Sequence, residues 1–251
     1  MEHPNKLKQH DELQRDENLF FHNPEPVDSR KNITFIIATN NESQFNTSVE
    51  HLNQIIIPKG YTVNMVKIKQ AKSMTEAYNT AMKLSKAKYK IYLHQDVFIL
   101  NRRFLFNLLQ AFDSNPSLGL VGLCGAVKLP PSGIWWEAER KVGKVIENRL
   151  TYQYVDFEEV RDTVEYVEAV DGFFIATQYD IQWREDVFDG WHFYDASQCK
   201  EFEHAGYQVG VPRQSVPWCL HNLGVRHFID NKSYKKYQQK FLQEYRYSMI
   251  K

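Results

Sequence analysis

Asp96 is the residue in this sequence that is best placed for metal chemistry. It ends the tripeptide His94-Gln95-Asp96, which directly follows the apolar run 89–93. A carboxylate at the end of a buried strand can bind a hard divalent cation, and that cation can in turn bind a diphosphate. An aspartate in this position is also common as a helix N-cap or a turn residue. The chemistry at Asp96 therefore depends on the residues that accompany it.

Two further side chains have the right chemistry for the same site. Asp195 could act as a general base if it lies within hydrogen-bond reach of a hydroxyl, although it could also cap a helix that starts before Ala196. His221 follows the apolar run 218–220, and an imidazole is a competent ligand for manganese. A lone histidine is more often structural, so both readings of His221 stay open at this point.

The elements that must position these residues alternate between strand and helix. Ser73 and Glu76 have the spacing of a capping box, which predicts a helix start. Such alternation predicts a mostly parallel sheet flanked by helices, in which ligands bind beyond the carboxyl ends of the strands. The expected order is strand 33–38, helix 44–57, strand 61–68, helix 73–86 and strand 89–93.

The second half of the chain has a less regular pattern. Residues 118–127 and 167–176 are expected to be strands, whereas 130–160 has the pattern of a long irregular excursion. The expected organisation is a charged N-terminal arm over 1–31, one α/β domain over 32–230 and an amphipathic helix over 231–251.

Composition excludes several classes of protein. The chain has 251 residues, enough for one large core, and equal numbers of acidic and basic residues, so no overall field attracts nucleic acid. Its three cysteines have neither metal-ligand nor disulfide-framework spacing, and no long apolar segment predicts a membrane span or signal peptide. A cytoplasmic location is the expectation.

Several motifs occur in an order that resembles the family 2 glycosyltransferases. The stretch 36–41 is similar to that family's first strand, and 73–96 is similar to its helix with an internal Asn followed by a strand that ends in Asp-x-Asp. Further on, 170–175 and 188–207 are similar to its Gly-containing strand, its Glu-Asp motif and the helix that ends in Ala-Gly-Tyr. The resemblance implies the Rossmann-like GT-A fold, in a branch with His-Phe-Tyr-Asp and Trp-Cys-Leu-His patterns.

The resemblance also implies an activity, namely inverting transfer of a sugar from a nucleotide-diphosphate sugar to an acceptor hydroxyl. Asp195 takes the place of the general base, and Asp96 takes the place of the last Asp of Asp-x-Asp, where it would hold a metal on the diphosphate. His221 takes the place of the late His that many GT-A enzymes supply to the metal, so the resemblance implies that Asp96 and His221 bind Mn²⁺ or Mg²⁺. The donor is expected to contact Thr39, Asn41, Glu42, Asn79, His94, Gln95 and Asp96. The acceptor side is expected to include Trp135, Trp136, Asp171, Gly172, His192 and Tyr194.

Three departures from the family pattern leave alternatives open. His94 replaces the first Asp of Asp-x-Asp and Tyr194 replaces the Glu of Glu-Asp, so metal binding could be weak. The strand 61–69 has no acidic residue that would identify the nucleobase. One alternative is a catalytically silent sugar- or nucleotide-binding protein. Another is a nucleotidyltransferase, although 39–43 contains neither the glycine nor the lysine that its phosphate loop would need.

The expected acceptor is a carbohydrate, a glycolipid or a glycoprotein. Trp135 and Trp136 could stack on a sugar ring or anchor a loop. Lysines and tyrosines alternate in the C-terminal helix, which could lie on the inner face of a membrane. The favoured alternative is that this helix packs on its own domain or on the partner in a homodimer.

Overall fold

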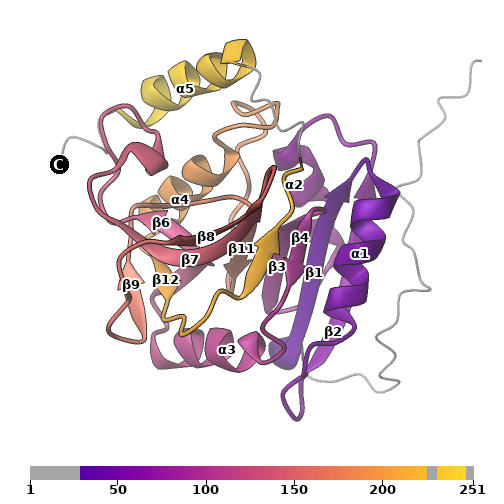
Figure 1. Cartoon of the computed structure of the whole chain (residues 1–251). Coiled ribbons are helices and arrows are strands. Elements are labelled where there is room, and N and C mark those ends of the chain that lie inside the picture. Colours follow the sequence, from indigo (N-terminus) through magenta and orange to yellow (C-terminus); the bar gives the residue numbers. More distant parts are fainter. Residues whose placement is uncertain (1–28, 225–230, 247–251) are drawn as a thin grey trace, which may run out of the picture.

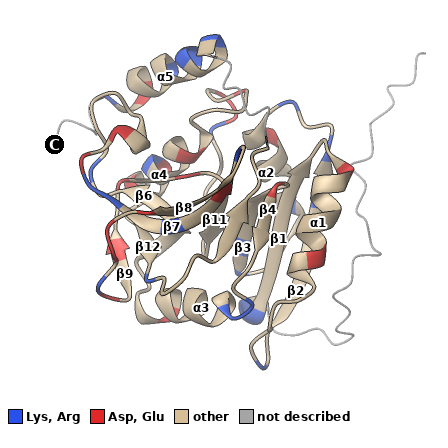
Figure 2. Ribbon diagram, viewed as in Figure 1, with Lys and Arg blue, Asp and Glu red and all other residues tan. Residues whose placement is uncertain are grey.

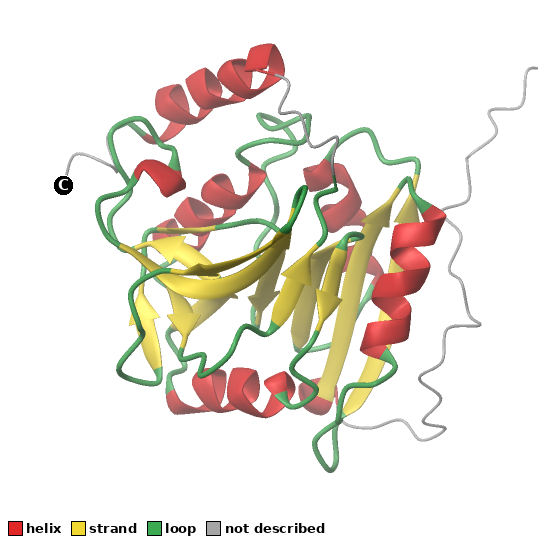
Figure 3. Cartoon of the chain, viewed as in Figure 1, coloured by secondary structure: helices red, strands yellow, loops and turns green. Residues whose placement is uncertain are grey.

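The computed structural model describes residues 29–224 and 231–246 and forms an α/β structure with two sheets (Figures 1 and 3). The larger sheet has the order β2 (Thr62–Lys69), β1 (Asn32–Thr39), β3 (Tyr89–His94), β11 (Phe174–Thr177), β5 (Leu118–Gly122), β12 (Gln208–Pro212), β9 (Val164–Tyr166). The smaller one has the order β10 (Ala169–Val170), β6 (Cys124–Ala126), β7 (Lys141–Asn148), β13 (Cys219–His221), β4 (Val97–Ile99), and β8 (Tyr152–Asp156) pairs with β7.

Helices cover both faces of the larger sheet. They are α1 (Glu42–Leu52), α2 (Met74–Leu84), α3 (Phe104–Ser114), α4 (Tyr194–His204) and α5 (Asn231–Tyr245), with short 3-10 turns η1 (Ser29–Lys31) and η2 (Trp135–Glu137). All strands of the larger sheet run in one direction except β9 and β11, so the expected mostly parallel sheet is confirmed. The described residues leave out 1–28, which is most of the expected N-terminal arm, and also 225–230 and 247–251.

Strand β1 shows why the run after Asn32 is almost wholly apolar. Phe35 and Ile37 contact one hydrophobic cluster, which includes residues of α1 and α3, whereas Ile36 contacts a second cluster that includes residues of α2 and α4. Successive side chains of a strand point to opposite faces, so a central strand covered on both faces is apolar throughout.

Helix α1 begins and ends earlier than the expected range of 44–57. Asn41 is its N-cap, and its side chain accepts hydrogen bonds from the N–H groups of Ser43 and Gln44. The helix ends at Leu52, and the β-branched residues that follow lead into Pro58, which disfavours helical geometry in the residue before it. The expected start of α2 is confirmed, since Ser73 accepts from the N–H of Glu76.

The second half departs from expectation where the chain passes between the sheets. The expected strand 118–127 is divided at Leu123 into β5 and β6, and 167–176 is divided at 171–173 into β10 and β11. These breaks carry Asp171 and Gly172 to the junction of the two sheets. The expectation of an irregular excursion over 130–160 was wrong, because β7 and β8 form a long antiparallel hairpin there.

Helix α5 packs on its own domain. Tyr237, Phe241 and Tyr245 are buried, and Lys240 donates to the Val187 carbonyl and to Asp189. These aromatic side chains are therefore not available to a lipid surface, and Figure 2 shows basic residues gathered toward one end of α5. Across residues 29–224 and 231–246, no helix is both long and apolar enough to cross a bilayer.

Candidate metal centre and active site

A pocket of about 210 Å³ lies at the carboxyl ends of β1, β2 and β3. This is the edge of the sheet at which parallel α/β folds bind ligands. Its polar lining comes from three separate strand ends, and Trp191 lies on its rim with 46% of its surface exposed. The polar and aromatic lining residues are Thr39, Asn40, Gln70, His94, Gln95, Asp96 and Trp191.

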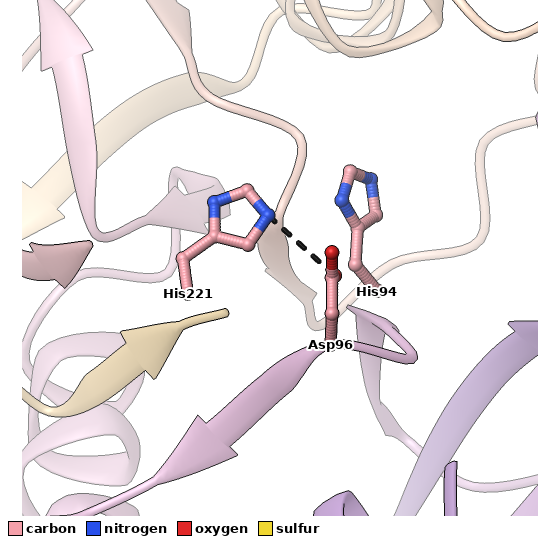
Figure 4. Close-up of side chains that lie close together, drawn as sticks. All are labelled: His94, Asp96 and His221. Atoms are coloured by element: carbon pink, nitrogen blue, oxygen red, sulfur yellow. Dashed lines mark ion pairs between the residues drawn. The ribbon is translucent and has the colours of Figure 1, made fainter. Parts of the chain in front are cut away.

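His94, Asp96 and His221 form a compact group beside this pocket (Figure 4). One possible ligand atom from each residue lies within 4.8 Å of the others, and His221 Nε2 is 3.5 Å from Asp96 Oδ1. His94 and Asp96 flank the end of β3, whereas His221 ends β13 of the smaller sheet. Pairing of β13 with β4 brings His221 opposite Val97 and so places it next to Asp96.

The donor set of this group fits a divalent cation. His221 Nε2 is buried, and among the described residues it has no hydrogen-bond partner beyond its 3.5 Å contact with Asp96. Buried polar atoms are normally paired, so this nitrogen is available to bind a cation. Two imidazoles and one carboxylate are suitable ligands for manganese. His94 thus adds a third candidate ligand to the two that the sequence indicated.

The charges within the group favour an ionised Asp96. Burial raises the pKa of Asp96, but the contact with His221 and the positive charges of His221 and His94 outweigh it, so the pKa lies below its usual value. Burial lowers the pKa of His221, but the neighbouring Asp96 outweighs it and the pKa is raised.

Asp195 lies in the first turn of α4, where its surroundings raise its pKa, whereas those of Asp96 lower it. Its carboxylate accepts hydrogen bonds from the N–H of Gly172 at 3.0 Å and from the N–H of Ala196 at 2.8 Å. Burial, together with the negative charge of Asp171, raises the pKa of Asp195 to about 7. The N-cap of α4 is Phe193, not Asp195, so Asp195 is not the capping residue.

Tyr194 is influenced by both carboxylates. Its hydroxyl shares a hydrogen bond with His94 Nε2, and it precedes Asp195 in α4. Burial is the main cause that raises the pKa of Tyr194, and the negative charges of Asp195 and Asp96 both add to it. Asp96 and Asp195 are thus close enough to act on one buried hydroxyl.

The expected donor residues fall into two groups. Thr39, His94, Gln95 and Asp96 line the pocket. Gln95 also holds the loop after β1 in place. Its side-chain oxygen accepts hydrogen bonds from the Thr39 hydroxyl and from the N–H groups of Asn40 and Asn41.

The other three expected donor residues have structural partners and are not among the pocket-lining residues. Asn41 caps α1, and Glu42 forms ion pairs with Lys67 and Lys69. Asn79 is buried and bonds to the main chain of Trp183 and to Glu185. Contact of these three residues with a donor stays a prediction.

The expected acceptor residues cluster around Asp195 and under α5. Gly172 bonds to Asp195, and Asp171 acts on it through its charge. Trp135 is buried, whereas Trp136 is 43% exposed and packs on Tyr234 of α5. The ring of His192 also contacts Tyr234.

Sequence reasoning missed Tyr234, Trp191 and Glu147. The charges of Asp195 and Asp171 act on the Tyr234 hydroxyl, and the charge of Glu147 acts on His221. Tyr234 carried no sign of this role beyond the aromatic pattern of the tail, because only the docking of α5 brings it to the site.

Comparison with solved structures supports the fold. GalNAc-T7, solved with UDP, GalNAc and Mn²⁺, matches with a TM-score of 0.56 and 12% identity over 94% of this chain and 50% of that one. The mannosyltransferase PcManGT from Pyrobaculum calidifontis, solved with GDP-Man and Mn²⁺, matches with a TM-score of 0.51 and 14% identity over 88% and 65%. S. aureus TarS matches with a TM-score of 0.50 and 11% identity over 76% and 36%.

The chain thus spans between about a third and two thirds of the length of these three proteins. All three have the GT-A fold, so the expected fold is confirmed. No curated protein sequence matches the chain. The model of the glycosyltransferase-like family matches residues 34–245, which is most of the sequence, and the chain therefore belongs to this family.

Proposed function

We propose that this protein transfers a sugar from a nucleotide-diphosphate sugar to an acceptor hydroxyl, with inversion at the anomeric carbon. The observation that carries the proposal is the His94–Asp96–His221 group, two of whose members also line the pocket at the strand ends. A diphosphate in that pocket would lie beside the cation ligands. Manganese is the favoured ion, with magnesium as the alternative, because two of the three candidate ligands are imidazoles.

One group of residues is proposed to bind the donor and its cation. His94, Asp96 and His221 would hold the cation, and Thr39 and Gln95 shape the donor pocket. When bound, a divalent cation supplies positive charge that stabilises the charge developing on the departing diphosphate.

Asp195 is the proposed general base. A carboxylate with a pKa of about 7 is half ionised near neutral pH, so it can take a proton from the acceptor hydroxyl as that hydroxyl attacks. The hydrogen bonds from Gly172 and Ala196 fix the direction of the carboxylate. Trp136, His192 and Tyr234 form an aromatic surface suited to a carbohydrate acceptor.

A thermal-shift titration tests the donor half of the proposal. Nucleoside diphosphates and their sugars are added with and without Mn²⁺, and we expect them to add stabilisation beyond that of Mn²⁺ alone only when Mn²⁺ is present, since a ligand at about 100 times its Kd adds about 2.7 kcal/mol to the free energy of unfolding. Asp96→Ala should abolish this stabilisation and leave the midpoint of the ligand-free protein nearly unchanged. Asp162→Asn, a change at an exposed aspartate, is the matched control.

The result that would contradict the proposal is a large loss of stability in ligand-free Asp96→Ala, because that would make Asp96 a structural residue. Stabilisation by the nucleotide alone, with no dependence on any cation, would remove the metal from the proposal. Binding without transfer by the unaltered protein would instead favour a catalytically silent binding protein.

A further inference from the structure

We infer that Tyr194 is a positioning residue: its hydroxyl orients His94 for cation binding, while its buried ring sets the place of the Asp195 carboxylate. The inference rests on the proposed function and deepens it. It assigns to one side chain the geometric link between the cation ligands and the general base.

The first step is the contact between Tyr194 and His94. The tyrosine hydroxyl is hydrogen-bonded to His94 Nε2, and Tyr194 is only 4% exposed. A histidine that binds a metal through one ring nitrogen almost always donates the N–H of the other to a fixed acceptor, which sets both tautomer and ring direction. With Nε2–H donating to the Tyr194 hydroxyl, His94 would bind a cation through Nδ1.

The second step is that the Tyr194 ring has little room to move. It packs against the rings of Tyr78 and Trp183, with centroid distances of 6.0 and 6.1 Å, in a buried aromatic cluster. The hydroxyl end of the ring lies close to Gly172, where an added Cβ would be 2.2 Å from the Tyr194 hydroxyl oxygen. A phenol held in this way is a fixed acceptor for His94.

The third step connects the same ring to Asp195. The Gly172 N–H donates to Asp195 Oδ2 at 3.0 Å, and a Cβ at this position would lie 2.2 Å from the Tyr194 hydroxyl oxygen and 3.0 Å from Asp195 Cβ, so Gly172, Tyr194 and Asp195 pack closely together. Phe193 adopts a left-handed conformation, with φ of 60°, immediately before Tyr194. Such a conformation is costly for a bulky residue and is found where the surrounding structure enforces it, often at functional sites. The turn at Phe193 therefore places Tyr194 and Asp195 at the site together, since both follow it directly in the first turn of α4.

The test is Tyr194→Phe, which removes the hydroxyl and keeps the ring. We expect Mn²⁺ affinity, measured by calorimetry without any nucleotide, to fall about 10- to 100-fold, the range seen when partners behind metal ligands are removed. In ¹⁵N NMR, the ring nitrogens of His94 should show one fixed tautomer in the unaltered protein and a mixture in the variant. Tyr78→Phe is the matched control, because its hydroxyl is buried in the same cluster and has no hydrogen-bond partner among the described residues.

A double-mutant cycle separates positioning from general damage. In a His94→Ala background, adding Tyr194→Phe should leave Mn²⁺ affinity unchanged, since the hydroxyl acts through His94. Equal Mn²⁺ affinity in Tyr194→Phe and the unaltered protein would overturn the inference while leaving the proposed function intact. Equal losses in Tyr194→Phe and Tyr78→Phe would also overturn it. Absence of Mn²⁺ binding in the unaltered protein would overturn the proposed metal centre and the inference with it.

Discussion

The two halves of the larger sheet build their parts of the site by different means. On the donor side, β2, β1 and β3 run parallel in unbroken register, and the polar residues at their ends are held by nearby caps and by Gln95. On the acceptor side the strands are interrupted at Leu123 and at 171–173, and Asp195 is held there by the N–H of Gly172. The donor side is thus built on the ends of continuous parallel strands, and the acceptor side on the breaks where the chain passes between the two sheets.

The two carboxylates differ in the same way. Partners with positive charge lower the pKa of Asp96, whereas burial and the charge of Asp171 raise the pKa of Asp195. A pair of acids whose surroundings push their pKa values apart is suited to two different tasks. Asp96 is set to bind a cation, and Asp195 is set to accept a proton.

Asp195→Asn should give the largest loss of activity. The variant keeps the shape of the side chain but cannot accept a proton, so transfer should fall about 10²- to 10⁴-fold, with Mn²⁺ affinity unchanged. The measurement is sugar transfer to acceptor under saturating donor. Asp171→Asn provides the comparison, because it removes the neighbouring carboxylate and should have a much smaller effect. The reverse order of these two losses would transfer the role of base to Asp171.

The pH dependence should show the raised pKa directly. Below about pH 7, transfer should fall about tenfold per pH unit as Asp195 becomes protonated, and above it transfer should level off. A pH series of kcat checks this. A kcat that stays constant from pH 5 to 8 would show that no group of this kind limits the reaction.

Stability should change with pH in the opposite sense. The folded protein binds the Asp195 proton more tightly than the unfolded chain, whose carboxyl has a pKa of about 3.8, so the free energy of unfolding should fall as pH rises from 4 to 7. The contribution is at most a few kcal/mol, since each pKa unit corresponds to about 1.4 kcal/mol. Denaturant titrations of the unaltered protein and of Asp195→Asn should differ in this slope.

The comparison of the two halves also explains what the sequence alone could predict. The strand and helix alternation up to Asp96 was readable because each element carries its own periodicity and cap, as Ser73 does for α2. The breaks at Leu123 and at 171–173 were not, because the chain remains apolar while it passes from one sheet to the other. His221 was chosen from its place after an apolar run, but the role of His94 as a third candidate ligand required the spatial pairing of β13 with β4.

Gly172→Ala tests the close packing that the acceptor side depends on. The new Cβ would lie within 2.2 Å of the Tyr194 hydroxyl oxygen and 3.0 Å from Asp195 Cβ, so both side chains must move. Overpacking of this kind costs about 1–3 kcal/mol, and transfer should fall as well because the carboxylate is displaced. Chemical denaturation and a transfer assay measure the two effects. Gly206→Ala is the control, since a Cβ there meets nothing within 4 Å and only its φ of +84° is strained.

Asn79→Ala should have the smallest effect on donor use and tests whether Asn79 belongs to the donor side at all. The Asn79 side chain bonds to the main chain of Trp183 at 2.8 and 2.9 Å and to Glu185 at 2.8 Å, so its loss leaves the buried N–H of Trp183 without its acceptor. That should cost about 1–3 kcal/mol of unfolding free energy, while the KM for donor changes little. Gln198→Ala, which removes a buried amide bonded to the Ile181 carbonyl, is the matched control. A large rise in donor KM with an unchanged midpoint would instead make Asn79 a donor-binding residue.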